Sequence, residues 1–129
     1  AYELTTDYSI CLVAVDENDL AIGAIVVWVI VDEAHVATIA VHPDQQQGGI
    51  GTCLLAHSLL KAYERGARSS LLEVRQSNLT ARKLYERFGY QTMGFRKNYY
   101  QDNQEDALLL TLFSIDDSAI RELISAKCL

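Results

Sequence analysis

A glycine-rich stretch between two apolar segments has the residue types of an anion-binding loop. It reads Gln46-Gln47-Gly48-Gly49-Ile50-Gly51, and it separates a β-branched run ending at Val41 from a helical pattern beginning at Ile50. The first N–H groups of a helix have no intrahelical partners and lie at the positive end of its dipole. Glycine lets a phosphate approach them closely, so the stretch favours a phosphate site; a turn that merely requires glycine is the alternative.

Two common nucleotide-binding patterns do not fit this loop. No Gly-Lys-Ser/Thr triplet follows it, which excludes a Walker loop, and Leu54 stands where a Rossmann fingerprint has its third glycine. The strand before the loop ends at His42-Pro43-Asp44, because Pro43 cannot donate to a ladder. We therefore expect a strand, a phosphate loop and a helix without either motif.

One carboxyl group and one phenol further along the chain are candidates for proton transfer. Glu73 lies in an expected strand, and Tyr85 lies on the apolar stripe of an expected helix that Asn78 caps. A carboxylate can accept the proton of an amine, and a tyrosine can donate a proton to a leaving group. The alternatives are structural: a solvated carboxylate, a core tyrosine and a simple helix cap.

Hydrophobic periodicity predicts six strands and three helices that must position these residues. The expected strands are Ser9–Asp16, Ala21–Val31, Ala34–Val41, Ser69–Arg75, Tyr90–Tyr100 and Asp106–Phe113. The expected helices run from Ile50 to Arg65, from Asn78 to Phe88, and onward from the capping-box-like Ser114-Ile115-Asp116-Asp117. Gly66 and Gly89 are expected to end the first two helices, and Gly94 to form a bulge. This order predicts an α/β fold with a mixed, mostly antiparallel sheet flanked by helices, whose third and fourth strands are parallel.

Length and composition limit the class of protein. The 129 residues favour a single domain over 1–129, and a hydrophobic content of 50% excludes a disordered chain. The net charge of −6 argues against nonspecific binding to nucleic acid, and no apolar run approaches the ~18 residues of a membrane span. Cys11, Cys53 and Cys128 are widely spaced, so we expect no disulfide, no metal site and a reducing cytoplasm.

Several segments, taken together, resemble one enzyme family. The loop fits Q/R-x-x-G-x-G/A, and it is followed by LEVRQSN from Leu72, LYERFGY from Leu84, RKNYY from Arg96 and EDA from Glu105. In this order they resemble the GNAT acetyltransferase superfamily, and within it the RimI type, bacterial enzymes that acetylate the N-terminus of a ribosomal protein. The resemblance spans about residues 31–113 and implies the GNAT fold.

The resemblance also implies a co-substrate, acetyl-CoA, and a site for it without a metal. The residues implied to bind it are Ile39, Ala40, Val41, Gln46, Gln47, Gly48, Gly49, Ile50, Gly51, Thr52 and Asn78. In this family the strand residues bind the pantetheine and the loop binds the pyrophosphate. Glu73 corresponds to the general base and Tyr85 to the general acid of direct transfer in a ternary complex. The implied acceptor is a protein N-terminus, first of all a ribosomal-protein alanine, with no nucleic-acid or membrane partner.

Two alternatives to this activity stay open, and two features depart from the family. The same fold could acetylate a lysine or a small amine, or the chain could be an inactive regulator that senses acyl-CoA. Gly48 replaces a basic residue common in the family's loop. Family members begin with a strand and two helices that form one wall of the acceptor site, and we expect these elements to be missing before Ser9. The sequence assigns no oligomeric state.

Overall fold

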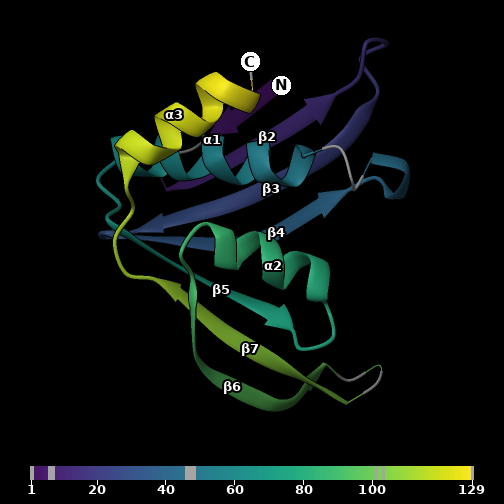
Figure 1. The fold of residues 1–129 in the computed structure, drawn as a ribbon, viewed down its shortest axis with the longest axis vertical. Helices are drawn as coiled ribbons and strands as arrows, with labels where there is room; N and C mark the ends of the chain where they lie inside the picture. Colours follow the sequence, from purple (N-terminus) through teal and green to yellow (C-terminus); the bar gives the residue numbers. More distant parts are fainter. Residues whose placement is uncertain (1, 6–7, 46–48, 101, 103, 129) are drawn as a thin grey trace.

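The computed structural model describes residues 2–5, 8–45, 49–100, 102 and 104–128. In these residues, seven strands form one sheet in the order β1-β2-β3-β4-β5-β7-β6 (Figure 1). The elements are β1 (Tyr2–Thr5), β2 (Ser9–Val15), β3 (Ala21–Ile30), β4 (Glu33–Val41), a 3-10 turn (Pro43–Gln45), α1 (Ile50–Glu64), β5 (Ser69–Arg75), α2 (Leu79–Arg87), β6 (Gln91–Tyr100), β7 (Glu105–Leu112) and α3 (Asp117–Lys127). None of the helices in these residues is long and apolar enough to cross a membrane.

The sheet is antiparallel except at one pair of neighbouring strands. β4 and β5 run parallel, joined by α1, which confirms the expected parallel pair and the mostly antiparallel sheet. The predicted bulge in β6 is also confirmed, because the register with β7 shifts between Thr92 and Gly94. Gly66 and Gly89 follow α1 and α2 with φ of 104° and 98°, as the expected helix ends require.

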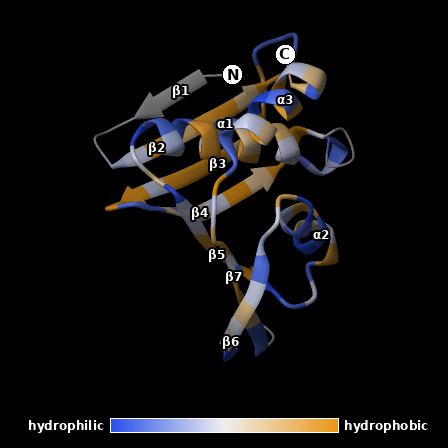
Figure 2. Ribbon diagram, turned by 60° about the vertical axis from the view of Figure 1, so that its left-hand side comes forward, coloured by the Kyte–Doolittle hydropathy of each residue, from blue (hydrophilic) through white to orange (hydrophobic). Residues whose placement is uncertain are grey.

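All three helices lie on one face of the sheet (Figure 1). Alternate strand residues such as Ile10, Ile25 and Val36 point to that face and form the core with buried residues of α1. Figure 2 shows the hydrophobic stretches of β2, β3 and β4 beneath α1 and α3. Leu55 and Leu59 of α1 are 0% exposed, and each such burial is worth about 1.5–3 kcal/mol. Most of the stabilising apolar contact is therefore on the helix face.

The opposite face of the sheet is more exposed. Trp28 is 45% and Ile30 47% exposed, and the ring of Trp28 lies 6.2 Å from that of Tyr8. These residues alternate along β3 with core residues such as Val27, so they point away from the helices. We call this surface the open face of the sheet.

Two predictions about the ends of the chain were wrong. Tyr2–Thr5 forms β1, antiparallel to β2, so an N-terminal strand is present where we expected none. Only residues 6–8 separate β1 from β2, a length too short for the family's two helices. The last helix is capped by Asp116, whose carboxylate accepts from the Ala119 N–H at 3.1 Å, and not by Ser114.

A disulfide joins Cys53 of α1 to Cys128 just after α3, contrary to the expectation of no disulfide. The two Cα atoms are 5.5 Å apart, although the residues are separated by 75 positions in the sequence. They meet because α3 packs along α1, a tertiary contact that cysteine spacing does not reveal. Cys11 is free.

Candidate active site

The parallel strands β4 and β5 separate halfway along their length. Their register runs from Glu33↔Ser69 to Val36↔Leu72 and stops there. The cause lies in β4, where Val26 of β3 pairs with Thr38 and Val27 with Val36, leaving Ala37 as an extra residue. A bulge of this kind bends a strand, here away from β5. A cavity of about 350 Å³ opens between the two strands.

The cavity between the strands, which we call the split cavity, connects the two faces of the sheet. Val74 of β5 and Tyr85 of α2 line it on the helix face. Glu73 lines it from the open face, since successive strand residues point to opposite sides. The structure therefore brings the two predicted proton-transfer residues, which come from different elements, to one cavity.

Glu73 and Tyr85 differ in their surroundings. The Glu73 side chain is 31% exposed, and its Oε1 lies 3.3 Å from Nη2 of Arg96. Tyr85 is 3% exposed, and its ring lies edge-on to that of Tyr90 at 5.6 Å. Burial, with a smaller contribution from Tyr100, raises the pKa of Tyr85 to about 12. The hydroxyl is therefore protonated throughout the physiological range, the form that a proton donor requires.

On the helix face the split cavity continues into a groove of about 370 Å³ between β4, α1 and α2. Both cavities are lined by Ile39, Asn78, Ala81 and Tyr85. The far end of the groove is the start of α1, where Gly49, Gly51 and Thr52 line it. Gly49 has φ of 80°, which favours glycine, and it provides no side-chain cap to the first turn. Within the described residues, no side chain at the cap position accepts from the first N–H groups of this helix, which have no partners inside the helix itself.

The predicted cofactor residues divide into three groups in the structure. Those that line the groove are Ile39, Val41, Gly49, Gly51, Thr52 and Asn78. The side chains of Ala40 and Ile50 do not line the groove. Ala40 lies between Ile39 and Val41 in β4, so its side chain points to the opposite face of the sheet. Ile50 packs against Gly23 of β3, where its methyl group would lie 3.1 Å from a Cβ at that position. Gln46, Gln47 and Gly48 lie outside the described residues.

Asn78 caps the start of α2, which is the structural alternative given for it above. Its Oδ1 accepts from the Ala81 N–H at 3.2 Å and caps α2. Because that cap fixes the start of α2, it also fixes the approach of Ala81 and Tyr85 to the groove. A contact between Asn78 and a ligand stays a prediction.

On the open face, Glu73 and Tyr100 also line a broader cavity of about 570 Å³. Arg96 and Tyr99 of β6 form its rim with them, and the Arg96 guanidinium lies 5.4 Å from the centre of the Tyr99 ring. Burial and the neighbouring Glu73 carboxylate raise the pKa of Tyr100. The segment from Arg96 contributed to the family resemblance, but no local pattern in the sequence pairs Arg96 with Glu73.

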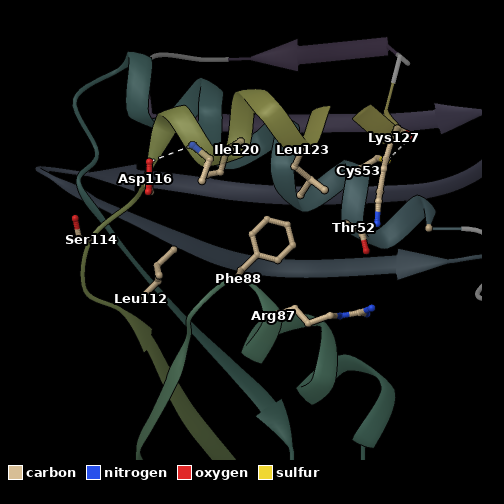
Figure 3. A pocket seen from close by; sticks show the side chains of 12 residues that line it. Thr52, Cys53, Arg87, Phe88, Leu112, Ser114, Asp116, Ile120, Leu123 and Lys127 are labelled. Carbon is tan, nitrogen blue, oxygen red and sulfur yellow. Dashed lines mark hydrogen bonds between the residues drawn. The ribbon is translucent and has the colours of Figure 1, made fainter. Parts of the chain in front are cut away.

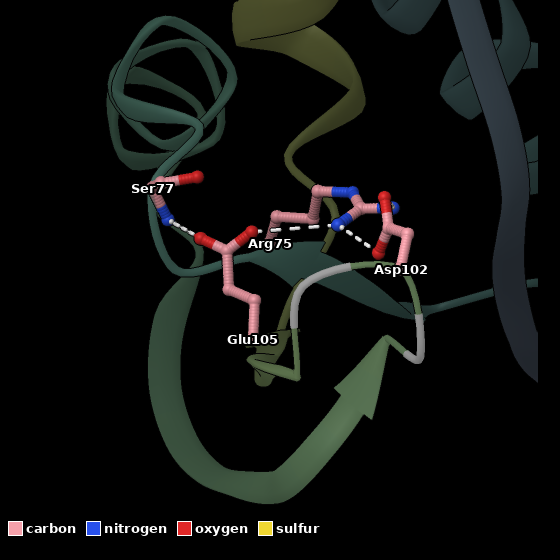
Figure 4. Close-up of polar contacts among 4 residues, drawn as sticks. All are labelled: Arg75, Ser77, Asp102 and Glu105. Atoms are coloured by element: carbon pink, nitrogen blue, oxygen red, sulfur yellow. Dashed lines mark hydrogen bonds and ion pairs between the residues drawn. The ribbon is translucent and has the colours of Figure 1, made fainter.

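A polar cluster connects this rim to the start of α2, beside the groove, and we call it the Arg75 cluster (Figure 4). Arg75 donates to both carboxylate oxygens of Asp102 at 3.1 Å and to Glu105 at 3.4 Å. Glu105 in turn accepts from the Ser77 N–H at 2.6 Å, just before α2. The guanidinium of Arg75 stacks 4.0 Å from the ring centre of Tyr100. The cluster thus joins β5, the start of α2 and the β6–β7 turn, a set of contacts between distant residues that sequence spacing could not indicate.

Sequence comparison relates the chain to acetyltransferases. The family model described as "Acetyltransferase (GNAT) domain" matches residues 7–92. The [ribosomal protein bS18]-alanine N-acetyltransferase of Escherichia coli (strain K12) is 43% identical over 86 residues, which make up 65% of this chain. The match covers 58% of that protein, so the chain spans less than two thirds of its length.

Solved structures show the same architecture. The ribosomal-protein-S18-alanine N-acetyltransferase from Escherichia coli has a TM-score of 0.77 and 33% identity, covering 87% of this chain and 74% of that one. A GNAT family acetyltransferase from Elizabethkingia anophelis with acetyl-CoA bound has a TM-score of 0.72 and 25% identity, covering 82% of this chain and 76% of that one. Strands that separate around a cavity, a glycine-started helix and a family match over most of the chain agree: this chain belongs to the GNAT family of acetyltransferases.

Proposed function

We propose that this chain transfers the acetyl group of acetyl-CoA to the N-terminal α-amino group of a protein, first of all to an alanine of a ribosomal protein. The observation that carries the proposal is the meeting of Glu73 and Tyr85 in the split cavity, where one face offers a donor groove and the other an open rim. The RimI-type relatives, named for this reaction, support the choice of acceptor.

The groove on the helix face fits the shape and charge of acetyl-CoA. Ile39, Val41 and Leu84 give it apolar walls for the pantetheine arm. Beyond the bulge, residues 38–40 of β4 have no partner strand on the β5 side among the described residues, so backbone groups there can pair with the amides of the arm. The first turn of α1 supplies N–H groups and a positive dipole end for the pyrophosphate.

The chemistry divides between the two faces. A neutral amine nitrogen attacks the thioester carbonyl, and its proton passes to Glu73, directly or through water. The C–N bond forms, the C–S bond breaks, and the electron pair leaves with the sulfur. Tyr85 donates its proton to that sulfur and takes one back from solvent, while Glu73 releases the amine's proton to solvent. Burial of Tyr85 preserves its proton until negative charge develops beside it.

An acceptor of this kind places the reaction in the cytoplasm, where ribosomal proteins are made. Thiol reductants in the cytoplasm reduce accessible disulfides, and in this chain they would act on the Cys53–Cys128 bond. The reaction requires no metal, since attack, proton transfer and departure all involve amine, carboxyl, phenol and thioester groups.

A turnover assay with matched acceptors tests the proposal. We expect acetyl-CoA to be consumed with an alanine-initiated ribosomal-protein peptide and not with the same peptide blocked at its N-terminus but carrying a free lysine. Preference for the blocked lysine peptide or a polyamine would instead assign acetylation of a lysine or a small amine to this chain. Binding of acetyl-CoA without turnover on any of the three acceptors would favour a regulator that senses acyl-CoA.

A further inference from the structure

A further cavity, of about 460 Å³, lies next to the proposed acetyl-CoA groove, between α1, the end of α2 and α3 (Figure 3). Its lining is more apolar than polar, and the large apolar side chains in it are Phe88, Leu112, Ile120 and Leu123. This volume is within the usual range for small-molecule sites, about 300–1,000 Å³. We call it the α3 cavity.

The α3 cavity adjoins the groove at the start of α1. Gly49, Thr52 and Arg87 line both spaces. A ligand that follows the groove to the first turn of α1 therefore comes next to the α3 cavity at these residues. The part of acetyl-CoA that lies beyond the pyrophosphate is its adenosine with a 3′-phosphate.

The opening of the α3 cavity carries two positive charges. Arg87 at the end of α2 and Lys127 at the end of α3 are exposed and line it. Figure 3 shows both side chains extending toward Thr52. Neither is paired with a carboxylate in the part of the chain that the structure describes. The acidic group that lines the cavity, Asp116, is engaged in capping α3.

We propose that the α3 cavity binds the nucleotide end of acetyl-CoA. The adenine ring enters between α1 and α3 against Phe88 and Leu123, where an aromatic face and aliphatic side chains suit a purine. The phosphate meets Arg87 and Lys127 at the opening, in charge-assisted contacts. This site rests on the proposed use of acetyl-CoA, and it adds a role for α3, which packs along α1.

Binding measurements without an acceptor test the site separately from the activity. The probes are CoA, 3′-dephospho-CoA, pantetheine and 3′,5′-ADP, measured by calorimetry on the oxidised protein. Lys127→Gln removes one phosphate contact and Leu123→Gln makes the purine wall polar. Lys83→Gln is the matched control, because Lys83 is an exposed lysine on α2 that lines no described cavity.

We expect the parent to bind 3′,5′-ADP in competition with CoA. Lys127→Gln should weaken CoA by roughly tenfold, the size of a charge-assisted contact, and leave 3′-dephospho-CoA and pantetheine unchanged. Leu123→Gln should weaken CoA and 3′-dephospho-CoA while sparing pantetheine, and Lys83→Gln should change none of the affinities. Equal losses for all probes, or unchanged CoA affinity in folded Lys127→Gln and Arg87→Gln/Lys127→Gln proteins, would overturn the site. CoA binding to the parent without turnover on any acceptor would leave the site in place and contradict the proposed function alone.

Discussion

The proposed donor side and the proposed acceptor side of the site are built by different kinds of contact. On the helix face, the groove is formed by backbone at the start of α1 and by packed side chains of β4 and α2. On the open face, the rim is formed by largely exposed residues of β6 and held by ion pairs such as Glu73–Arg96. The split cavity, which Tyr85 and Glu73 line, belongs to both.

This difference teaches where specificity can vary. Packing and backbone hydrogen bonds are fixed by the fold, so the donor side keeps its shape when surface residues change. Exposed ion pairs contribute about 0–1 kcal/mol each and reorganise readily. We therefore expect substitutions on the acceptor side to change the acceptor's KM, and substitutions on the donor side to change the KM of acetyl-CoA.

Tyr85→Phe should have the largest effect, because it acts where the two sides meet. The ring and its packing against Tyr90 are retained, so only the proton donor is lost. We expect kcat to fall by about 10²–10⁴-fold with little change in either KM. Since the pKa of Tyr85 is raised to about 12, this residue should cause no loss of rate in the parent as the pH rises to about 10. If folded Tyr85→Phe protein turned over at the same rate as the parent, Tyr85 would be a core residue without a role in proton transfer.

Glu73→Gln should slow the chemical step by about 10²-fold at pH 7, lowering kcat and kcat/KM together. The loss should shrink as the pH passes the α-amino pKa of about 7.7–8.0, because the amine then loses its proton to solvent. The measurement is the pH–rate profile of the variant beside the parent.

The control for Glu73→Gln is Arg96→Gln, which breaks the same 3.3 Å ion pair but keeps the carboxylate. We expect Arg96→Gln to alter the acceptor's KM without a pH-dependent loss of kcat. A constant ratio of rates between Glu73→Gln and parent across pH 6 to 9 would assign Glu73 to the ion pair and not to proton transfer.

Gly51→Ala should weaken acetyl-CoA by about tenfold and leave the acceptor's KM unchanged. The added Cβ would lie 3.5 Å from Leu84 and 3.7 Å from Val41, ordinary contacts that the fold accommodates, but it occupies the groove wall. Gly94→Ala is the matched control, since its Cβ would lie 3.7 Å from Leu109, outside the groove. If a folded Gly51→Ala protein bound acetyl-CoA with unchanged affinity, acetyl-CoA would not bind along this groove.

The features that the sequence predicted depend on neighbouring residues. Hydrophobic period, helix caps and glycine positions are local, which is why the start of α1, the Asn78 cap and the ends at Gly66 and Gly89 agree with the structure. The parallel pairing of β4 and β5 follows as well, because one helix connects them. The donor side, built largely from such features, was therefore predictable.

The features that the sequence did not predict depend on distant contacts. The Cys53–Cys128 disulfide arises from the packing of α3 on α1, and β1 is defined by its pairing with β2. The direction of the Ile50 side chain depends on β3, and Arg75 meets Glu105 across a register with β7. The open face is held by contacts of this second kind, so the segments from Arg96 and Glu105 could be matched to the family while the ion pairs that they make with Glu73 and Arg75 could not be predicted.

Arg75→Lys should have the smallest effect and should separate the two sides. Lysine keeps the charge but cannot hold both Asp102 oxygens and stack on Tyr100 at once. The β6–β7 turn should then shift relative to α2, raising the acceptor's KM by about threefold to tenfold, the loss of one or two exposed charge-assisted contacts. The KM of acetyl-CoA should stay within twofold, because the groove does not include Arg75. Glu105→Gln provides the comparison: it removes a charge from the same cluster while its amide oxygen still accepts from Ser77. If either substitution raised the KM of acetyl-CoA more than that of the acceptor, the Arg75 cluster would be holding α2 and the donor groove, and the division between the two sides would fail.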